Sequence, residues 1–197
     1  MAKKLEFYFD VASPPSWIAH ERLPDIIRRT GAALTLRPVL VGAIIKLTGN
    51  TAPVAVPAKR TYMMEVDLPR QARQHNVTLN FAPGAPFNSL NLMRGALIAD
   101  DLGRLADYAA TIFRATWAEA RDMSEPLIVS EVLDTAGFDA PELFDRAQDP
   151  AIKSRLVAAN EKAVARGVFG VPTFFVGPEM FFGQDRLDLV EQILGPA

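Results

Sequence analysis

The chain has no cysteine among its 197 residues. This absence excludes disulfides, thiolate metal ligands and cysteine nucleophiles, so any sulfur chemistry has to come from a bound molecule. It also excludes a dithiol oxidoreductase. Histidine is scarce, with two residues, and the acidic residues lack the spacing of paired metal ligands. We therefore predict no metal site.

The chain also lacks an excess of one charge and a long apolar run. Its 21 basic and 23 acidic residues give a net charge of -2, which excludes the basic footprint expected for nucleic acid or an anionic membrane. No segment approaches ~20 uninterrupted apolar residues. Glu6 and Asp10 interrupt the start, so no signal peptide is predicted. We expect a cytoplasmic protein whose partner is a small molecule or a second copy of the chain.

The first part of the sequence predicts a strand, a helix and a second strand. Apolar and polar residues alternate over 5–10, as in a strand with one apolar face. Ser13-Pro14-Pro15 is typical of a helix start, and Gly31 of its end. The residues from Leu34 to Val41 predict the second strand. A unit of this length favours a parallel pair with a right-handed crossover.

The remaining sequence is first helical and then returns to strands. Amphipathic stretches cover 57–75, 89–121, 126–136 and 141–166, and short strands at 173–176 and 180–183 precede a helix at 185–194. The order βαβ…ββα predicts an α/β fold with one mixed sheet, interrupted by a helical insertion. The expected domains are a sheet domain made of 1–43 and 163–197 and a helical insertion at 44–162.

Three segments carry candidate chemistry. Ser13 precedes a helix, whose N-terminus offers backbone donors and a partial positive charge to an anion or thiolate. A simple N-cap is the alternative. Pro172 stands directly before a β-rich run. A cis Val171-Pro172 bond would offer the Val171 backbone to an extended peptide, whereas an ordinary proline before a strand is the alternative. Asp185 could hold an amino acid's ammonium group or only cap the last helix.

Together these segments, in this order, resemble a known family. It is the thioredoxin-like group of the kappa glutathione transferases and 2-hydroxychromene-2-carboxylate isomerases. The resemblance covers essentially the whole chain. Its carriers are Phe7-Tyr8-Phe9-Asp10 with Ser13-Pro14, Gly49-Asn50, Val66-Asp67-Leu68, Phe113-Arg114-Ala115-Thr116-Trp117, Val168-Phe169-Gly170-Val171-Pro172-Thr173 and Phe182-Gly183-Gln184-Asp185-Arg186-Leu187.

The resemblance implies a thioredoxin-like fold and a set of glutathione contacts. It implies that Ser13 faces the glutathione sulfur and that Pro172 is a cis-proline, with Val171 bonding the cysteinyl part of glutathione. Gln184 and Asp185 match the positions that hold the γ-glutamyl end. Asn50 matches an asparagine near glutathione and substrate. The chain departs from the family at Gln184, where serine or asparagine is commoner, and at Pro15, where an aromatic residue is usual. The departure at Pro15 bears on the shape of the wall of the substrate pocket.

The same resemblance implies a glutathione-dependent isomerase of aromatic-degradation pathways, such as naphthalene degradation, that forms a homodimer. The substrate pair would be 2-hydroxychromene-2-carboxylate and trans-o-hydroxybenzylidenepyruvate, isomerised by reversible addition of a thiolate. We take Lys46, Lys59 and Arg60 as candidates for the substrate carboxylate, with solvated helix charges as the alternative. Phe87 is a further candidate for substrate contact. A kappa-type transferase and a non-catalytic peptide-binding module are the alternative functions.

Overall fold

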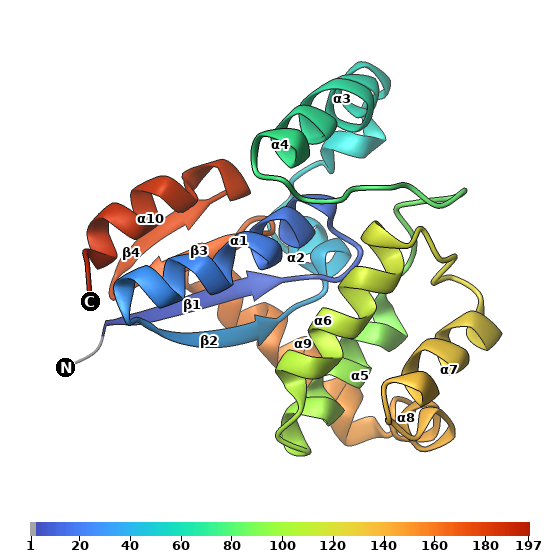
Figure 1. Ribbon diagram of the computed structural model, residues 1–197. Helices are drawn as coiled ribbons and strands as arrows, with labels where there is room; N and C mark the ends of the chain where they lie inside the picture. Colours follow the sequence, from blue (N-terminus) through green and yellow to red (C-terminus); the bar gives the residue numbers. More distant parts are fainter. Residues whose placement is uncertain (1–2) are drawn as a thin grey trace.

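The computed structural model describes residues 3–197, so the first two residues of the expected sheet domain lie outside the described part. Four strands form one mixed sheet in the order β2-β1-β3-β4 (Figure 1). β1 pairs parallel with β2 and antiparallel with β3, which pairs antiparallel with β4. The predicted order βαβ…ββα is confirmed. The strands are β1 (Lys4–Phe9), β2 (Ala33–Pro38), β3 (Thr173–Val176) and β4 (Glu179–Phe182).

Helices and the loops between them make up the rest of the described chain. Two helices belong to the sheet units: α1 (Pro14–Thr30) connects β1 to β2, and α10 (Leu187–Leu194) follows β4. The others follow β2 and precede β3, apart from η4 (Gln184–Arg186), a short 3-10 turn before α10. These are α2 (Val41–Leu47), η1 (Pro53–Ala55), α3 (Pro57–Thr61), η2 (Tyr62–Asp67), α4 (Leu68–Gln74), α5 (Leu90–Asp101), α6 (Leu105–Phe113), η3 (Arg114–Ala118), α7 (Pro126–Thr135), α8 (Ala140–Arg146) and α9 (Pro150–Ala165).

Period-two alternation along β1 gives the sheet two apolar faces. Phe7 stacks on Phe9 and on Phe174 of β3, with ring centroids 5.3 and 5.2 Å apart, in the cluster that contains the buried side of α1. Tyr8 points to the opposite face, where it packs with Phe175 and residues of α2 and α9. The sheet is therefore covered by α1 and α10 on one face and by α9 on the other (Figure 1). Because strand side chains alternate between faces, a one-residue slip in register would expose this core.

The second strand is shorter than the sequence predicted, and the expectation that it continues to Val41 is wrong. β2 ends at Pro38, and α2 begins at Val41. The backbone N–H groups of Leu40 and Val41 donate to the side chains of Asn160 and Asp10, each at 2.8 Å, instead of to a neighbouring strand. These two distant side chains satisfy the first amides of α2, which local sequence patterning does not reveal.

The helical segments between the two halves of the sheet pack against it without a break in the core. Buried residues of β1, α1, α5, α6, α7 and α8 belong to one hydrophobic cluster. The division into a sheet domain and an insertion at 44–162 stays a prediction. Among residues 3–197, no helix combines the length and apolarity that crossing a membrane requires.

Candidate functional site

Ser13 lies in the turn that joins the carboxyl end of β1 to α1. Its side chain caps the helix, since Oγ accepts a hydrogen bond from the Ser16 N–H at 3.2 Å. The backbone N–H of Ser13 donates to the Asp10 carbonyl at 3.0 Å, which fixes the turn. The residue is 6% exposed, and within the described chain its hydroxyl proton has no acceptor. The cap therefore uses one lone pair of the oxygen and leaves the O–H free for a ligand.

The first turn of α1 offers no free backbone donor. Pro14 and Pro15 occupy the first two helical positions, and proline has no N–H. The next N–H, that of Ser16, is used by the Ser13 side chain, and the N–H of Trp17 donates to the Ser13 carbonyl at 3.1 Å. A ligand at this end would thus meet the helix dipole and the Ser13 hydroxyl, but not the unpaired amides that a helix start usually provides.

The proline loop before β3 lies beside the same end of β1. The antiparallel register pairs Thr173 with Tyr8, so the two residues before Thr173 come next to the end of β1. The Val171-Pro172 bond is cis, as predicted, and a second cis bond, Ala85-Pro86, was not predicted. In the described part of the chain, neither the N–H nor the C=O of Val171 has a hydrogen-bond partner, although the residue is only 8% exposed. Val171 therefore presents an unused strand edge.

The segment Gly183–Asp185 lies against the proline loop. The Gly183 N–H donates to the Pro172 carbonyl at 2.9 Å. Gln184 is buried and Asp185 is exposed. The last α-helix begins at Leu187, two residues later than predicted, and the Asp185 side chain makes no cap bond. The capping interpretation of Asp185 is therefore wrong, and its carboxylate has a weak contact of 3.6 Å with Arg186.

Asn50 reaches the outer side of the same loop. It follows α2, and its Nδ2 donates to the Phe169 carbonyl at 3.4 Å. The Phe169 ring in turn packs on that of Phe182, with centroids 4.5 Å apart. Asn50 is exposed, so its side chain can be approached from solvent. The fold thus gathers the residues expected to bind glutathione around the end of β1 and the loop before β3.

The residues expected to contact the substrate lie farther along the chain, on α2, on α3 and before α5. Lys46 is exposed in the last turn of α2. Lys59 and Arg60 are exposed on α3, and Arg60 reaches the Ala85 carbonyl at 3.5 Å. Phe87 is half-buried against the core. No hydrogen bond joins these four residues to Ser13 within the described chain, so their role stays a prediction.

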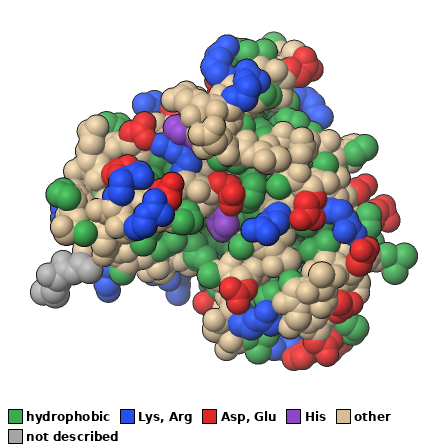
Figure 2. All heavy atoms as spheres, in the orientation of Figure 1, with side chains coloured by type: hydrophobic (Ala, Val, Ile, Leu, Met, Phe, Trp, Pro, Cys, Tyr) green, Lys and Arg blue, Asp and Glu red, His purple; other side chains and the backbone are tan. Residues whose placement is uncertain are grey.

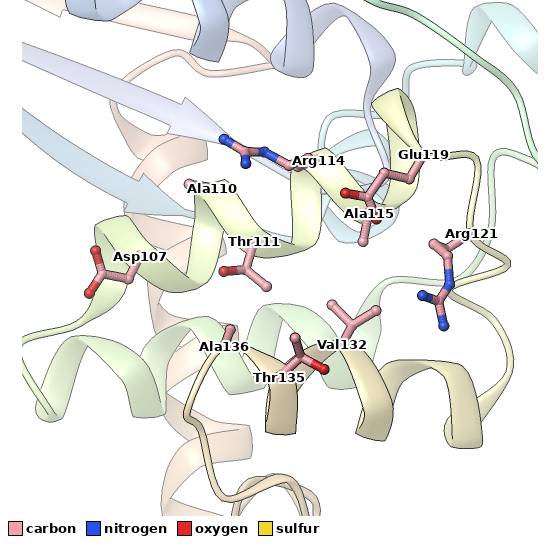
Figure 3. A pocket seen from close by; sticks show the side chains of 10 residues that line it. All are labelled: Asp107, Ala110, Thr111, Arg114, Ala115, Glu119, Arg121, Val132, Thr135 and Ala136. Carbon is pink, nitrogen blue, oxygen red and sulfur yellow. The ribbon is translucent and has the colours of Figure 1, made fainter.

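Partly open cavities occur among the helical segments, and Ser13 does not line them. One cavity of about 390 Å³ is bounded by α6, η3 and α7, with Thr111, Val132 and Thr135 among the side chains that face it (Figure 3). Basic and acidic side chains are interspersed on the face drawn in Figure 2. Among residues 3–197, no three His, Asp or Glu side chains are grouped as metal ligands.

Asp10 is a buried acid beneath the site whose importance sequence reasoning missed. Its Oδ1 accepts from the Ala12 N–H at 2.9 Å and its Oδ2 from the Val41 N–H at 2.8 Å. Burial raises the pKa of this carboxyl, while hydrogen bonds from Val41, Ala12 and Ser89 act in the opposite direction. Asp10 therefore joins the Ser13 turn to the start of α2. The sequence offered two signals for it, an acid directly after an apolar strand and its place in the motif Phe7-Tyr8-Phe9-Asp10.

We expect Asp10→Asn to lower the free energy of unfolding by about 1–3 kcal/mol, because its amide would turn an NH₂ toward one of two backbone N–H donors. The folded state raises the Asp10 pKa above its ordinary 3.8. The free energy of unfolding of the wild type therefore falls as pH rises from 3.8 through the higher pKa that Asp10 has in the folded state. The deficit of the variant should be largest at low pH and shrink above it. Denaturant unfolding of both proteins across this range measures it, and a deficit independent of pH would contradict the argument.

Comparisons with known proteins identify the family of the chain. The family model described as DSBA-like thioredoxin domain matches residues 4–195. The chain is 32% identical to 2-hydroxychromene-2-carboxylate isomerase of Sphingobium xenophagum, over 98% of this chain and 99% of that one. It is 28% identical to glutathione S-transferase kappa 1 of Homo sapiens, over 99% and 92%.

A solved structure of 2-hydroxychromene-2-carboxylate isomerase superimposes with a TM-score of 0.88, at 28% identity, over 98% of this chain and 94% of that one. The likeness covers the sheet and the helices between its halves alike, so the predicted thioredoxin-like fold with a helical insertion is confirmed. The family named from the sequence motifs is confirmed as well. The chain belongs to the family of proteins with a DSBA-like thioredoxin domain, with 2-hydroxychromene-2-carboxylate isomerases and kappa-class glutathione transferases among its relatives.

Proposed function

We propose that this protein is a glutathione-dependent isomerase that interconverts 2-hydroxychromene-2-carboxylate and trans-o-hydroxybenzylidenepyruvate, or a close aromatic analogue. Relatives named for this activity, 32% identical over nearly the full chain, support the proposal. The observation that carries it is the unpaired edge of Val171, in a loop that adjoins the end of β1 before the Ser13 turn and that is bonded through Pro172 to the segment containing Asp185. A cytoplasmic location and a homodimer belong to the same proposal.

The residues around this edge fit the groups of glutathione. The N–H and C=O of Val171 match the backbone of a cysteinyl residue bound as an additional strand. The exposed carboxylate of Asp185 and the Gln184 segment suit the ammonium and carboxylate of the γ-glutamyl end. Pro172 shapes the loop that presents Val171, and Asn50 stands at its outer side. The Ser13 hydroxyl is a donor suited to the sulfur.

Ser13 has the central chemical role in this proposal. Glutathione, when bound, would supply a thiolate that adds reversibly to the conjugated double bond of the substrate, so that rotation can precede elimination. A free thiol has a pKa near 8.5, and a helix N-terminus together with a hydroxyl donor lowers it. Since Pro14 and Pro15 remove two amide donors, the O–H of Ser13 is the direct hydrogen-bond donor left for that sulfur.

The substrate carboxylate would be held by basic residues of the segments that follow β2. Lys46, Lys59 and Arg60 are exposed there, on α2 and α3. Lys59 borders an open cavity of about 450 Å³ together with Tyr62 and Met63. We assign ring contact to Phe87, which lies between α4 and α5. Alanine substitution at each basic position separates a contact to the carboxylate from a solvated surface charge.

A kappa-type transferase is the second candidate, and the 28% identity to the human enzyme favours it. The discriminating experiment follows free glutathione while purified protein turns over a chromene carboxylate. An isomerase needs glutathione in catalytic amounts and consumes none, whereas a transferase consumes one molecule for each product. Retained glutathione binding without turnover of any electrophile would instead favour a non-catalytic peptide-binding module.

Asp185→Asn tests the γ-glutamyl contact. We expect the glutathione concentration for half-maximal rate to rise by a few-fold to a hundredfold, for a charge-assisted bond of about 1–3 kcal/mol. The maximal rate should change much less, because the contact is made equally in the ground and transition states. Glutathione titrations of wild type and variant at fixed substrate measure this. Asp145→Asn, on the exposed side of α8, is the control, and superimposable curves for Asp185→Asn would remove this residue from the site.

A further inference from the structure

Arg22 joins the helix that begins after Ser13 to the segment that contains Gln184 and Asp185. It lies on α1, and its side chain is 11% exposed. One guanidinium nitrogen, Nη1, donates to the Gln184 carbonyl at 2.8 Å. The other, Nη2, is paired with the Asp188 carboxylate at the start of α10. A single shielded guanidinium thus binds the first residue of the turn at Gln184–Arg186 and the first turn of the helix that follows it.

The residue that precedes this turn is attached to the proline loop. The Gly183 N–H donates to the Pro172 carbonyl at 2.9 Å. Gly183 has a φ of +103°, and a Cβ at this position would collide with Oδ1 of Asp185. The turn is therefore tight and is fixed by the proline loop on one side and by Arg22 on the other. Removing Arg22 would leave the Gln184 carbonyl without its partner, so that the turn would be held by the proline loop before it and by the buried Leu187 after it, without a bond to α1 at Gln184.

We propose that Arg22 is a positioning residue for glutathione. It sets the separation between the Ser13 turn and Asp185, so that one tripeptide reaches both with its thiol and its γ-glutamyl end. The inference rests on the proposed function and deepens it. Arg22 acts through Gln184 instead of touching the ligand, and its contribution is preorganisation. A turn already held in place loses less freedom when the ligand binds, which raises affinity without a new contact.

Arg29 provides a matched control within the same pair of helices. It lies two helical turns farther along α1. Its Nη2 donates to Glu191 of α10 at 2.9 Å, and its Nε pairs with the same carboxylate. Arg29→Gln therefore removes an ion pair between α1 and α10 and leaves the turn at Gln184 untouched. Arg22→Gln removes an ion pair between the same helices together with the bond to the turn.

The test is calorimetric titration with glutathione in the absence of substrate. We expect the dissociation constant of Arg22→Gln to rise about tenfold, as for a lost bond to a charged group, and that of Arg29→Gln to stay within about twofold of wild type. With substrate, the KM for glutathione should rise in Arg22→Gln by the same factor, while kcat at saturating glutathione stays within about threefold. Arg22→Lys keeps the positive charge but lacks the two guanidinium nitrogens that bond different partners, so it should recover part of the affinity for glutathione.

Cysteinylglycine, which lacks the γ-glutamyl group, separates positioning from general loosening of the fold. It cannot use Asp185, so wild type and Arg22→Gln should bind it equally weakly. An equal loss of affinity for glutathione in both arginine variants would overturn the inference and leave the proposed function intact. A loss of cysteinylglycine binding in Arg22→Gln would do the same. Absence of glutathione binding by the wild type would overturn the proposed function and the inference with it. Should Arg22→Gln fail to fold, the comparison is made with Arg22→Lys, and wild-type affinity there would contradict the need for a forked donor.

Discussion

Replacing Ser13 with alanine should lower glutathione-dependent turnover by roughly 10- to 150-fold at neutral pH, for the loss of a hydrogen bond of about 1.5–3 kcal/mol to a charged sulfur. The expected loss is large because nothing else in the turn can replace the hydroxyl. Pro14 and Pro15 have no N–H, and the N–H groups of Ser16 and Trp17 are already used. The thiol of bound glutathione would then titrate closer to its free pKa near 8.5.

The variant should keep its fold, because the loss of an N-cap costs typically ~1 kcal/mol. Asp139→Ala is the control for that cost. Asp139 caps α8 by accepting from the Glu142 N–H at 2.9 Å, so its loss removes a similar bond from a helix other than α1. We expect Ser13→Ala to regain part of its rate as pH rises toward 8.5, and Asp139→Ala to follow the wild-type profile. Full activity of Ser13→Ala at neutral pH would remove Ser13 from the catalytic role.

Much of the fold could be predicted because its local signals agree with one another. The alternation in β1, the Ser13 cap with two prolines and Gly31 at the end of α1 all match the observed elements. The order of strands is confirmed for the same reason. The end of β2 could not be predicted, since the N–H groups of Leu40 and Val41 are satisfied by Asn160 and Asp10, which are distant in sequence. Backbone pairing by remote side chains leaves no periodic signal.

In the candidate site, too, residues in recognisable motifs could be predicted, whereas residues that act through distant partners could not. Motif resemblance selected residues that the proposed function places against glutathione, such as Ser13 and Val171, and the fold brings their segments to one end of β1. It gave no role to Arg22 or Asp10, because the side chain of each bonds other protein groups. Such supporting residues are recognised by their partners in space. The basic residues on α2 and α3 stay predictions, since their side chains are exposed and free to adopt several rotamers.

Trp117 should be among the most sensitive positions of the helical segments, because it connects them to the Ser13 turn. Its ring is fully buried in η3, and its Nε1–H donates to the Val11 carbonyl at 2.8 Å. Val11 lies between Asp10 and Ser13. We expect Trp117→Ala to lower the free energy of unfolding by about 3–5 kcal/mol. Since single domains are typically stable by about 5–15 kcal/mol, this loss can remove most of the folded population near physiological temperature.

Trp117→Phe separates the hydrogen bond from the buried volume. It restores most of the apolar contact but leaves the Val11 carbonyl unpaired, at a cost of about 1–3 kcal/mol. Tyr108→Phe is the matched control, because the buried Tyr108 O–H donates to the Leu92 carbonyl of α5 at 2.9 Å and not to a residue of the Ser13 turn. Both variants should lose comparable stability in denaturant unfolding, but only Trp117→Phe should also lose turnover under conditions in which it is fully folded. An equal loss of turnover in both variants would mean that Trp117 supports the core without holding the turn that presents Ser13.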